Sequence, residues 1–213
     1  MKIVYFSGED WEEDYVRGKL IKDDITFFKA PAQDYPTYKD KEAEVLSIFV
    51  KSRICKEELD RFPNIKFIST RSTGFDHIDL KETEKRGITV SNVPAYGANT
   101  VAEQAFALLL NLSKRVYESY NRVLEEGKFT SEGLRGFDLK GKTIGVVGTG
   151  NIGANAVKMA HGFGMKILAF DIKKNEELEK KFGIEYVEFD ELLSQSDIIS
   201  LHAPYNEHTH HMI

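Results

Sequence analysis

Short apolar runs alternate with helical patterns along the whole chain. Between these runs, apolar side chains recur every three to four positions on otherwise polar segments, which predicts helices that bury one face. Such alternation is typical of an α/β protein with a parallel sheet. In the first part of the chain it predicts strands and intervening helices, the strands over Lys2–Phe6, Ile25–Ala30, Val45–Val50, Lys66–Thr70 and Ile88–Val93 and the helices over Lys56–Phe62 and Leu80–Arg86.

One long helix is predicted from Val101 to Glu126, where apolar residues keep the helical period throughout. Thr100 and Glu103 have the spacing of a capping box, which gives Glu103 a structural reason to be there. Gly127 suits the end of this helix. The helix and the polar connection over Lys128–Lys142 therefore separate two α/β regions.

The alternation restarts after this connection. Its apolar runs predict strands over Thr143–Val147, Lys166–Phe170 and Ile198–Leu201 and a short extended segment, Tyr186–Val187. The segments between them predict helices over Asn151–Phe163, Glu176–Phe182 and Asp190–Gln195. A second parallel sheet is therefore expected in this part of the chain.

Composition narrows the class of protein. The chain has 213 residues, 41% of them hydrophobic and 30% charged, which is ordinary for a globular protein. A net charge of -5 with interspersed signs offers no basic stripe for nucleic acid, and no apolar run approaches the roughly 20 residues of a membrane span. The start of the chain lacks the pattern of a signal peptide. Cys55 is the single cysteine, so neither an intrachain disulfide nor a thiolate zinc site is expected, and a cytoplasmic location is the simplest expectation.

A glycine motif marks a nucleotide site. Gly148, Gly150 and Gly153 form the Gly-x-Gly-x-x-Gly pattern, directly after a predicted buried strand and at the start of a predicted helix. The first glycine allows a tight turn, the second lets backbone touch a pyrophosphate, and the third lets helix and strand pack closely. Amides at Asn151 and Ile152 would face the phosphates at the positive end of the helix dipole. The pattern therefore predicts a Rossmann domain that binds a dinucleotide.

Two further segments refine this site. Asp171 ends the next predicted strand, near the roughly 20-residue spacing at which an acid binds the adenosine ribose, and its charge would repel the extra phosphate of NADP. NAD is therefore the expected cofactor. His202, Ala203 and Pro204 follow the last predicted strand, at the sheet edge where ligands bind. They either contact the cofactor or form a plain loop in which Pro204 ends the strand.

The motifs together resemble the D-isomer-specific 2-hydroxyacid dehydrogenase family, over nearly the whole chain. The resemblance rests on Arg71–Asp79, on Val93–Tyr96 with Val101–Glu103, on the glycine motif, and on Ser200 through Thr209. The tyrosine at position 96 and the run Gly74–Asp79 look most like the D-lactate dehydrogenase branch. Gln104 departs from the histidine common in the family, a change not expected to affect the chemistry.

The resemblance implies a flavodoxin-like substrate domain over residues 1–99, a linking helix and connection over 100–142, and an incomplete Rossmann domain over 143–213. It also implies that NADH reduces a small 2-keto acid in the full-length protein. The amides of Thr73 and Gly74 would receive the substrate carboxylate, and Phe49 and Tyr96 would line the pocket. By the same positions NAD would contact Asn151, Ile152, Asp171, Ala203, Pro204 and Thr209, with His202 beside them.

The Thr73–Gly74 turn also has a physical basis. It follows the predicted strand Lys66–Thr70, so free backbone amides there can bind an anion. The alternative is a plain turn that needs Gly74 for its shape.

Catalytic residues are not found in the chain. The resemblance implies an Arg, a Glu and a His beyond residue 213, so we expect an N-terminal fragment that is inactive by itself. Consistently, a dinucleotide-binding domain needs two βαβαβ halves, and residues 143–213 supply one half and one further strand. Arg53 and Arg71 are cations without a positioned acid partner, and His77, next to Asp76 on a turn, is expected to be solvated or locally bonded. His202 is the best-placed imidazole without being the expected proton donor. His208, His210 and His211 are expected to be solvated, not to bind metal.

Two functions remain open. The first is an NAD-dependent enzyme that reduces a 2-keto acid, with pyruvate and D-lactate favoured over phosphoglycerate because Phe49 and Tyr96 are apolar. The second is a non-catalytic NAD-sensing or corepressor-like module with the same domains. The apolar helix Val101–Glu126 is either a homodimer face or part of the chain's own core.

Overall fold

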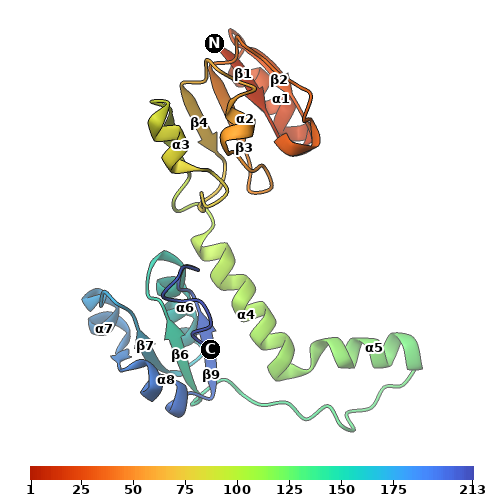
Figure 1. The fold of residues 1–213 in the computed structure, drawn as a ribbon. Coiled ribbons are helices and arrows are strands. Elements are labelled where there is room, and N and C mark those ends of the chain that lie inside the picture. Colours follow the sequence, from red (N-terminus) through yellow and green to blue (C-terminus); the bar gives the residue numbers. More distant parts are fainter. The chain divides into compact units, whose positions relative to one another are not determined.

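The computed structural model describes residues 1–213, which form two compact units, Met1–Tyr96 and Gly97–Ile213. Each unit holds its own parallel sheet (Figure 1). The units are described separately below.

The sheet of the first unit has the strand order β2-β1-β3-β4-β5, and every pair in it is parallel. This is the flavodoxin-like order, so the predicted fold of this unit is confirmed. Its strands are β1 (Lys2–Tyr5), β2 (Asp24–Phe27), β3 (Val45–Ile48), β4 (Phe67–Thr70) and β5 (Thr89–Ser91). Its helices are α1 (Asp10–Lys19), α2 (Lys56–Leu59) and α3 (Leu80–Lys85), with the 3-10 turn η1 over Ala32–Asp34.

Buried strand residues form the core of this unit. Val4, Leu46, Ile48 and Ile68 are fully inaccessible to solvent. Phe6, directly after β1, is also buried and stacks on Phe28 with ring centroids 5.0 Å apart. Because the strands are covered on both faces, they read as short continuous apolar runs.

Helix α1 was not predicted from the sequence. It buries no residue fully, and Val16 is the side chain that packs against the cluster of Ile3, Tyr5 and Ile25. Its first turn is held by polar contacts instead, since Glu9 and Glu12 form a capping box. A helix with so narrow an apolar stripe leaves little hydrophobic periodicity to detect.

The sheet of the second unit has the strand order β8-β7-β6-β9, again all parallel. Numbered from β6, this is the order 3-2-1-4 of the Rossmann fold, as expected for one βαβαβ half and one further strand. The strands are β6 (Thr143–Val147), β7 (Lys166–Phe170), β8 (Glu185–Tyr186) and β9 (Ile198–Leu201). The helices that follow them are α6 (Asn151–Gly162), α7 (Glu176–Phe182) and α8 (Phe189–Gln195).

The predicted long helix is two helices, α4 (Ala98–Lys114) and α5 (Val116–Glu126), separated by Arg115 in the left-handed conformation with φ of 54°. In a continuous helix the carbonyl of Ser113 would accept the amide of Tyr117. Here that carbonyl accepts the amide of Phe137, 2.9 Å away, and the Tyr117 amide donates to the Asn111 side chain instead. The returning segment thus interrupts the helix, which the periodicity of the helix itself does not reveal.

The start of α4 also differs from the prediction. The helix begins at Ala98, and the carbonyl of Gly97 accepts the amide of Val101. Glu103 accepts a hydrogen bond from the Asn99 side chain, so the proposed capping box with Thr100 is wrong. The prediction of Gly127 as the helix end is confirmed, because this residue caps α5 with φ of 63°.

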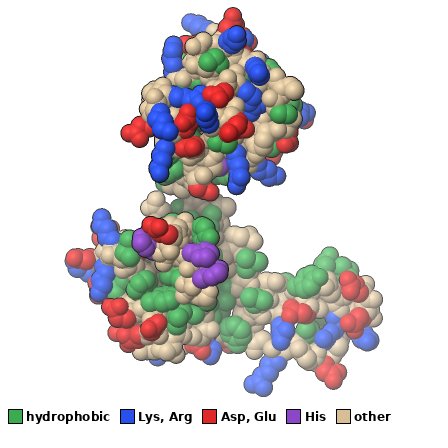
Figure 2. All heavy atoms as spheres, viewed as in Figure 1, with side chains coloured by type: hydrophobic (Ala, Val, Ile, Leu, Met, Phe, Trp, Pro, Cys, Tyr) green, Lys and Arg blue, Asp and Glu red, His purple; other side chains and the backbone are tan.

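Of the two helices α4 and α5, only α4 contributes buried residues to the core of the second unit. Ala102 and Phe106 are buried, and Phe106 stacks on Phe163 at 5.6 Å between ring centroids. By contrast α5 buries no residue, and its Tyr120 and Leu124 remain more than half exposed. Figure 2 shows hydrophobic side chains along α5. None of the helices combines the length and the hydropathy that a membrane crossing requires.

Candidate functional site

The glycine motif forms the turn between β6 and α6. Gly148 has φ of 88°, a left-handed conformation that favours glycine. A Cβ atom on Gly148 would lie 2.8 Å from the amide nitrogen of Ala203, so a side chain here would separate the turn from the end of β9. The amide of His202 donates to the Val147 carbonyl at 2.7 Å, which fixes that approach. Gly148 therefore brings the β6 turn against the segment that follows β9.

Gly150 faces open space. Its φ is -65°, which any residue adopts, and a Cβ atom there would meet nothing within 4 Å. The amides of Asn151 and Ile152, the first residues of α6, have no acceptor in the protein. No packing or conformational constraint within the chain accounts for this glycine, whereas the close approach of a pyrophosphate to the helix amides does. The loop therefore fits the dinucleotide that the motif predicts.

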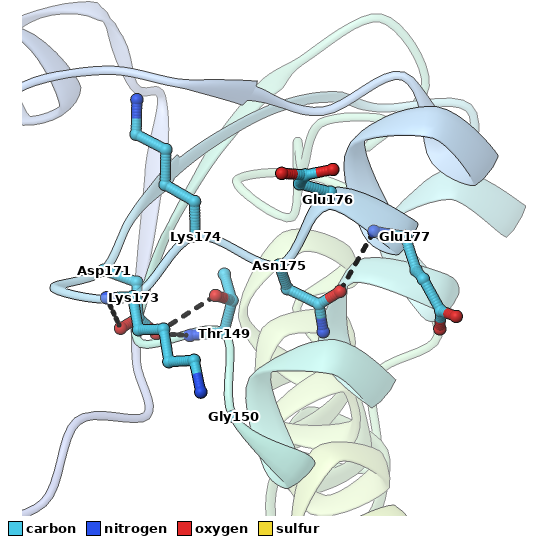
Figure 3. A pocket seen from close by; sticks show the side chains of 8 residues that line it. All are labelled: Thr149, Gly150, Asp171, Lys173, Lys174, Asn175, Glu176 and Glu177. Carbon is cyan, nitrogen blue, oxygen red and sulfur yellow. Dashed lines mark hydrogen bonds between the residues drawn. The ribbon is translucent and has the colours of Figure 1, made fainter.

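Asp171, at the end of β7, is bound to the glycine turn (Figure 3). Its carboxylate accepts the Thr149 amide at 2.5 Å, the Thr149 hydroxyl at 3.0 Å and the Lys173 amide at 2.9 Å. Burial by itself would raise the pKa of Asp171, but hydrogen bonds from Lys173, Thr149 and Ile172 outweigh it and lower the pKa below its ordinary value. The acid is therefore ionised at neutral pH and acts as an acceptor.

Two adjoining pockets share Gly150 and Asp171. The first, of about 430 Å³, is lined by the mostly polar and charged residues of Figure 3, among them Lys173, Lys174 and Asn175. The second, of about 330 Å³, is mainly apolar and is lined in part by Ile172, His202, Ala203, Pro204 and Thr209. An acid between a polar and an apolar pocket matches a ribose whose base enters the apolar side.

The segment after β9 forms one wall of the apolar pocket. The Thr209 hydroxyl donates to the Pro204 carbonyl at 2.6 Å, and this bond folds the segment into a closed loop. His202 is half-buried, and its Nε2 lies 2.9 Å from the Ser200 hydroxyl. Burial lowers the pKa of His202 from its ordinary value, so the imidazole is neutral at neutral pH. His202, Ala203, Pro204 and Thr209 thus line the apolar pocket beside Asp171.

The first unit has its own cluster of polar groups at the carboxyl ends of its strands. Thr73 and Gly74 follow β4, are exposed, and their amides have no acceptor in the protein. The turn is held from outside: the Asn92 side chain donates to the Thr73 carbonyl at 2.7 Å, and the Thr73 hydroxyl donates to the Val93 carbonyl at 3.1 Å. Two free amides in a fixed turn can bind an anion.

A chain of hydrogen bonds lies beneath this turn. The Ser72 hydroxyl donates to the Gly74 carbonyl at 2.7 Å, and Thr70 Oγ1 lies 2.6 Å from Ser72 Oγ. The Ser72 hydroxyl already donates its one hydrogen to Gly74, so the Thr70 hydroxyl must donate to Ser72. The Thr70 oxygen then accepts from His77 Nε2, which lies 3.1 Å away. His77 therefore carries a hydrogen on Nε2. Burial lowers its pKa, although the neighbouring Asp76 raises it in part.

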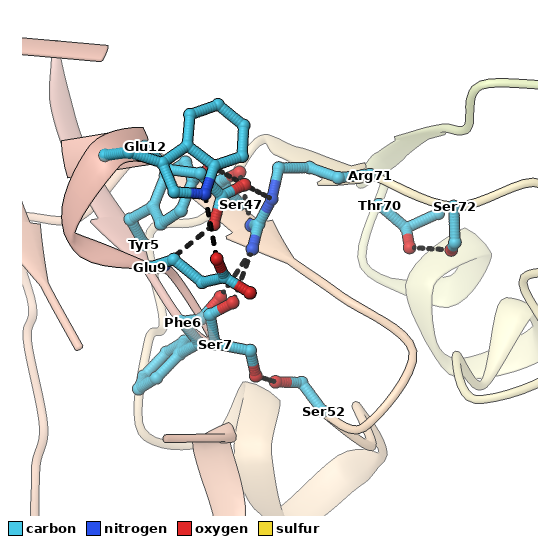
Figure 4. Close-up of polar contacts among 11 residues, drawn as sticks. Tyr5, Phe6, Ser7, Glu9, Glu12, Ser47, Ser52, Thr70, Arg71 and Ser72 are labelled. Atoms are coloured by element: carbon cyan, nitrogen blue, oxygen red, sulfur yellow. Dashed lines mark hydrogen bonds and ion pairs between the residues drawn. The ribbon is translucent and has the colours of Figure 1, made fainter. Parts of the chain in front are cut away.

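Arg71 ties the same strand ends together (Figure 4). Its guanidinium donates to the carbonyls of Phe6 and Ser7 at 3.0 and 2.9 Å and to the Ser47 hydroxyl at 3.1 Å. It also lies 3.9 Å from the centroid of the Tyr5 ring, a cation–π contact. The Glu12 carboxylate lies 3.5 Å from its Nε, so the prediction that Arg71 has no acid partner is wrong. These contacts point Arg71 into the domain and make it a structural residue that joins the ends of β1, β3 and β4.

The other two predicted substrate residues are less defined. Phe49 directly follows β3 at the same sheet edge, half-buried, with its ring 5.9 Å from the Arg71 guanidinium. Tyr96 is the last residue of the first unit and is 63% exposed. The contacts within the unit do not bring Tyr96 to Phe49 or to the Thr73–Gly74 turn.

Three residues of the nucleotide site were missed by the motif. Thr149 occupies a variable position of the pattern, and Ile172 is a fully exposed apolar residue directly after the acid. Tyr186, on β8, reaches Thr149 through its hydroxyl at 2.9 Å. A signal existed for Ile172, since an apolar side chain beyond the predicted end of a strand has no place in the core. The contact of Tyr186 with Thr149 depends on strand pairing, and no sequence signal indicated it.

The fold and the glycine turn together define an α/β protein with a dinucleotide-binding unit. Residues 106–213 match the family described as "D-isomer specific 2-hydroxyacid dehydrogenase, NAD binding domain". A 2-hydroxyacid dehydrogenase homolog of Haemophilus influenzae is 35% identical over 100% of this chain and 65% of its own length. A glyoxylate reductase of Thermococcus litoralis is 41% identical over 87% of this chain and 58% of its own.

A solved structure agrees with these relatives. The D-lactate dehydrogenase of Aquifex aeolicus, complexed with NAD and lactic acid, is similar over 99% of this chain and 63% of that one, with a TM-score of 0.87 and 37% identity. The chain belongs to the D-isomer-specific 2-hydroxyacid dehydrogenase family, and its second unit is an NAD-binding domain. The predicted family and cofactor are therefore confirmed, for a chain that spans about two thirds of the length of its relatives.

Proposed function

We propose that this chain supplies the substrate-binding domain and the first half of the NAD domain of an enzyme that reduces a 2-keto acid to the D-2-hydroxy acid. The observation that carries the proposal is the pair of free amides at Thr73 and Gly74. A fixed anion-binding turn, in a chain that also carries an NAD domain, fits a substrate with a carboxylate beside the carbonyl to be reduced.

In this proposal the cofactor is held by its adenosine and pyrophosphate portions. The amides of Asn151 and Ile152 bind the pyrophosphate over Gly150, and Asp171 accepts hydrogen bonds from the adenosine ribose. Ile172, Ala203 and Pro204 enclose the base. When bound, NADH supplies a hydride to the keto carbon. The residues of this chain bind and orient it.

We favour pyruvate as the substrate. Phe49 and Tyr96 are the apolar residues assigned to the pocket, and a small methyl ketone suits them better than a phosphorylated substrate. The Aquifex relative is complexed with lactic acid, which supports pyruvate, whereas the Thermococcus relative is a glyoxylate reductase. Glyoxylate is therefore the competing substrate to measure.

The proton for the forming alkoxide has no candidate donor among these residues. The Nε2 hydrogen of His77 is committed to Thr70, and His202 is half-buried against Ser200. No arginine points out of the Thr73–Gly74 turn to polarise a carbonyl, because Arg71 points inward. We therefore propose that the 213-residue chain binds NADH without turning over keto acid.

The test compares the 213-residue chain with the product of the complete gene. NADH binding is followed by the cofactor's fluorescence, and turnover by NADH oxidation with pyruvate, glyoxylate and phosphohydroxypyruvate. Binding by both proteins and turnover by the longer one alone, with pyruvate preferred, is the expected result. Binding without turnover by the longer protein would instead identify a non-catalytic NAD-sensing module.

We further propose that the exposed face of α5 belongs to a homodimer. The support is that Val116, Tyr120, Val123 and Leu124 are each about half exposed or more on a helix that buries nothing. Sedimentation of the complete protein should give a dimer, and Leu124→Glu should give a monomer. A wild-type monomer would contradict this proposal without bearing on the reaction.

A further inference from the structure

Tyr186 is joined to the acid that selects the cofactor by an unbroken chain of hydrogen bonds. The Asn175 amide lies 2.9 Å from the Tyr186 hydroxyl, which lies 2.9 Å from the Thr149 hydroxyl, which lies 3.0 Å from Asp171. The chain joins the turn after β6, the end of β7, the start of α7 and strand β8. Thr149, Asp171 and Asn175 line the polar pocket, whereas Tyr186 does not line it.

The direction of every bond in this chain is fixed. Asp171 is ionised, since its pKa is lowered, so its carboxylate only accepts. Thr149 must then donate its single hydrogen to Asp171, and Tyr186 must donate to Thr149. The Tyr186 oxygen in turn accepts the Asn175 amide. No member is free to reverse, so the chain holds the Thr149 hydroxyl on the carboxylate in a single arrangement.

Thr149 is the point where this restraint acts. It is 3% exposed and lies between Gly148 and Gly150, so its backbone is part of the pyrophosphate loop. Its amide and its hydroxyl both bind the same oxygen of Asp171. Hydrogen bonds therefore join the loop to the acid, and the Tyr186 hydroxyl on β8 orients the Thr149 hydroxyl that makes one of them.

The charged residues around Asp171 indicate what would follow if its carboxylate left the pocket. Lys173 and Lys174 line the same pocket as Asp171, and the Lys174 ammonium lies 5.8 Å from the centroid of the Tyr186 ring. Glu176 and Glu177 line this pocket as well, so an Asp171 carboxylate that rotated out would remove one of its three acids and leave both lysines beside the ribose position. Two ammonium groups there would attract the 2′-phosphate of NADP.

We propose that Tyr186 is a positioning residue for cofactor choice: through Thr149 it holds Asp171 in the pocket and so maintains the preference for NADH over NADPH. This inference rests on the cofactor site of the proposed function and adds to it a residue that does not touch the cofactor. Tyr186→Phe removes one oxygen and keeps the ring that packs against the core of the second unit. We expect this change to reduce the NADH preference, the ratio of the NADPH to the NADH dissociation constant, about tenfold.

The experiment is a double-mutant cycle on the 213-residue chain, read by calorimetric titration with NADH and with NADPH. Tyr186→Phe and Thr149→Val should each lower the preference, and the double variant should lower it no further than Thr149→Val alone. Thr149→Ser keeps the hydroxyl and should retain the wild-type preference. Tyr120→Phe, on exposed α5, is the matched control and should have no effect.

The remaining outcomes separate the hypotheses. An unchanged preference in Tyr186→Phe, or additive effects in the double variant, would overturn the role of Tyr186 and leave the cofactor site standing. Equal loss of both dinucleotides, with a lowered melting temperature, would show that Tyr186 only stabilises the fold and would also overturn it. If Tyr186→Phe does not fold, the difference between Thr149→Ser and Thr149→Val decides. Failure of the wild-type chain to bind either dinucleotide would overturn both this role and the proposed site.

Discussion

Gly153 on α6 lies directly against the carbonyl oxygen of Gly148, so close that a Cβ atom on Gly153 would overlap that oxygen. The obstacle is backbone and not a flexible side chain, so the helix would have to move away from β6. We expect Gly153→Ala to destabilise the second unit by about 3 kcal/mol, the upper range for overpacking. It should also weaken NADH binding, because the α6 amides would shift with the helix.

Gly162 on the same helix provides the control. A Cβ atom there would meet nothing within 4 Å, so Gly162→Ala should be neutral or stabilise the unit by up to about 1 kcal/mol. Urea unfolding and NADH titration of both variants check the pair. Equal effects of the two substitutions would contradict the role of Gly153 as the close-packing glycine.

Asp171 should make the stability of the second unit depend on pH. Its pKa in the folded protein is lowered from the ordinary value of 3.8, so it contributes stability above that value and loses it as the pH falls through the folded pKa. Asp171→Asn should therefore be less stable than the wild type at pH 7, and the difference should narrow below pH 3.8. Urea unfolding at several pH values measures it. A difference that stays constant with pH would show that the carboxylate's hydrogen bonds do not favour its charged form.

His77 should carry its hydrogen on Nε2, because the bonds through Thr70 and Ser72 leave it no other role. Long-range proton–nitrogen NMR of labelled histidine distinguishes the two tautomers directly. Glutamine retains an N–H donor near the Nε2 position, so His77→Gln should bind keto acid better than His77→Leu in the complete enzyme, with the difference in KM. A hydrogen on Nδ1 alone would refute the chain beneath the turn.

His77 should also make the stability of the first unit depend on pH, with a sign opposite to that of a histidine in a salt bridge. Burial lowers its pKa from 6.5, so below pH 6.5 the unfolded state binds a proton that the folded state does not. Wild-type stability should consequently fall between pH 6.5 and the folded pKa, and His77→Gln should lose less over this interval. Comparison of the two proteins cancels the contribution of His202.

Arg71 should be a major determinant of the stability of the first unit. Arg71→Met keeps much of the side-chain volume but leaves the carbonyls of Phe6 and Ser7 without this donor. We expect a loss of about 3 kcal/mol in the free energy of unfolding. Arg53→Met, at an exposed residue, should change it by less than about 0.5 kcal/mol. Similar stability of the two variants would show that the Arg71 contacts contribute little.

The sequence predicted the two parallel sheets well because their strands are buried on both faces and lie between clear helical periods. It also predicted the cofactor loop, since Gly148 and Gly150 are constrained by backbone geometry and by open space, which a motif records directly. Asp171 was found for a similar reason, because the end of a strand can be read from its apolar run. These features depend on residues that are near one another in the chain.

The features that escaped prediction depend on residues far apart. The break at Arg115 arises because Phe137 takes the carbonyl of Ser113, and neither residue has an unusual local pattern. The contact of Tyr186 with Thr149 requires β8 to pair with β7, a relation that periodicity does not contain. Helix α1 was missed for a different reason, because polar capping and one apolar contact at Val16 hold it.

The stacking of Phe106 on Phe163 has a practical consequence for how the protein is made. This contact holds α4 against α6 without any help from α5, which contributes no buried residue. We therefore expect the second unit to keep its fold when the peptide bond after Gly127 is cut. Two polypeptides divided there and synthesised separately should find each other through the α4–α6 contact and rebuild the nucleotide-binding unit, so the chain offers a natural site for a split reporter.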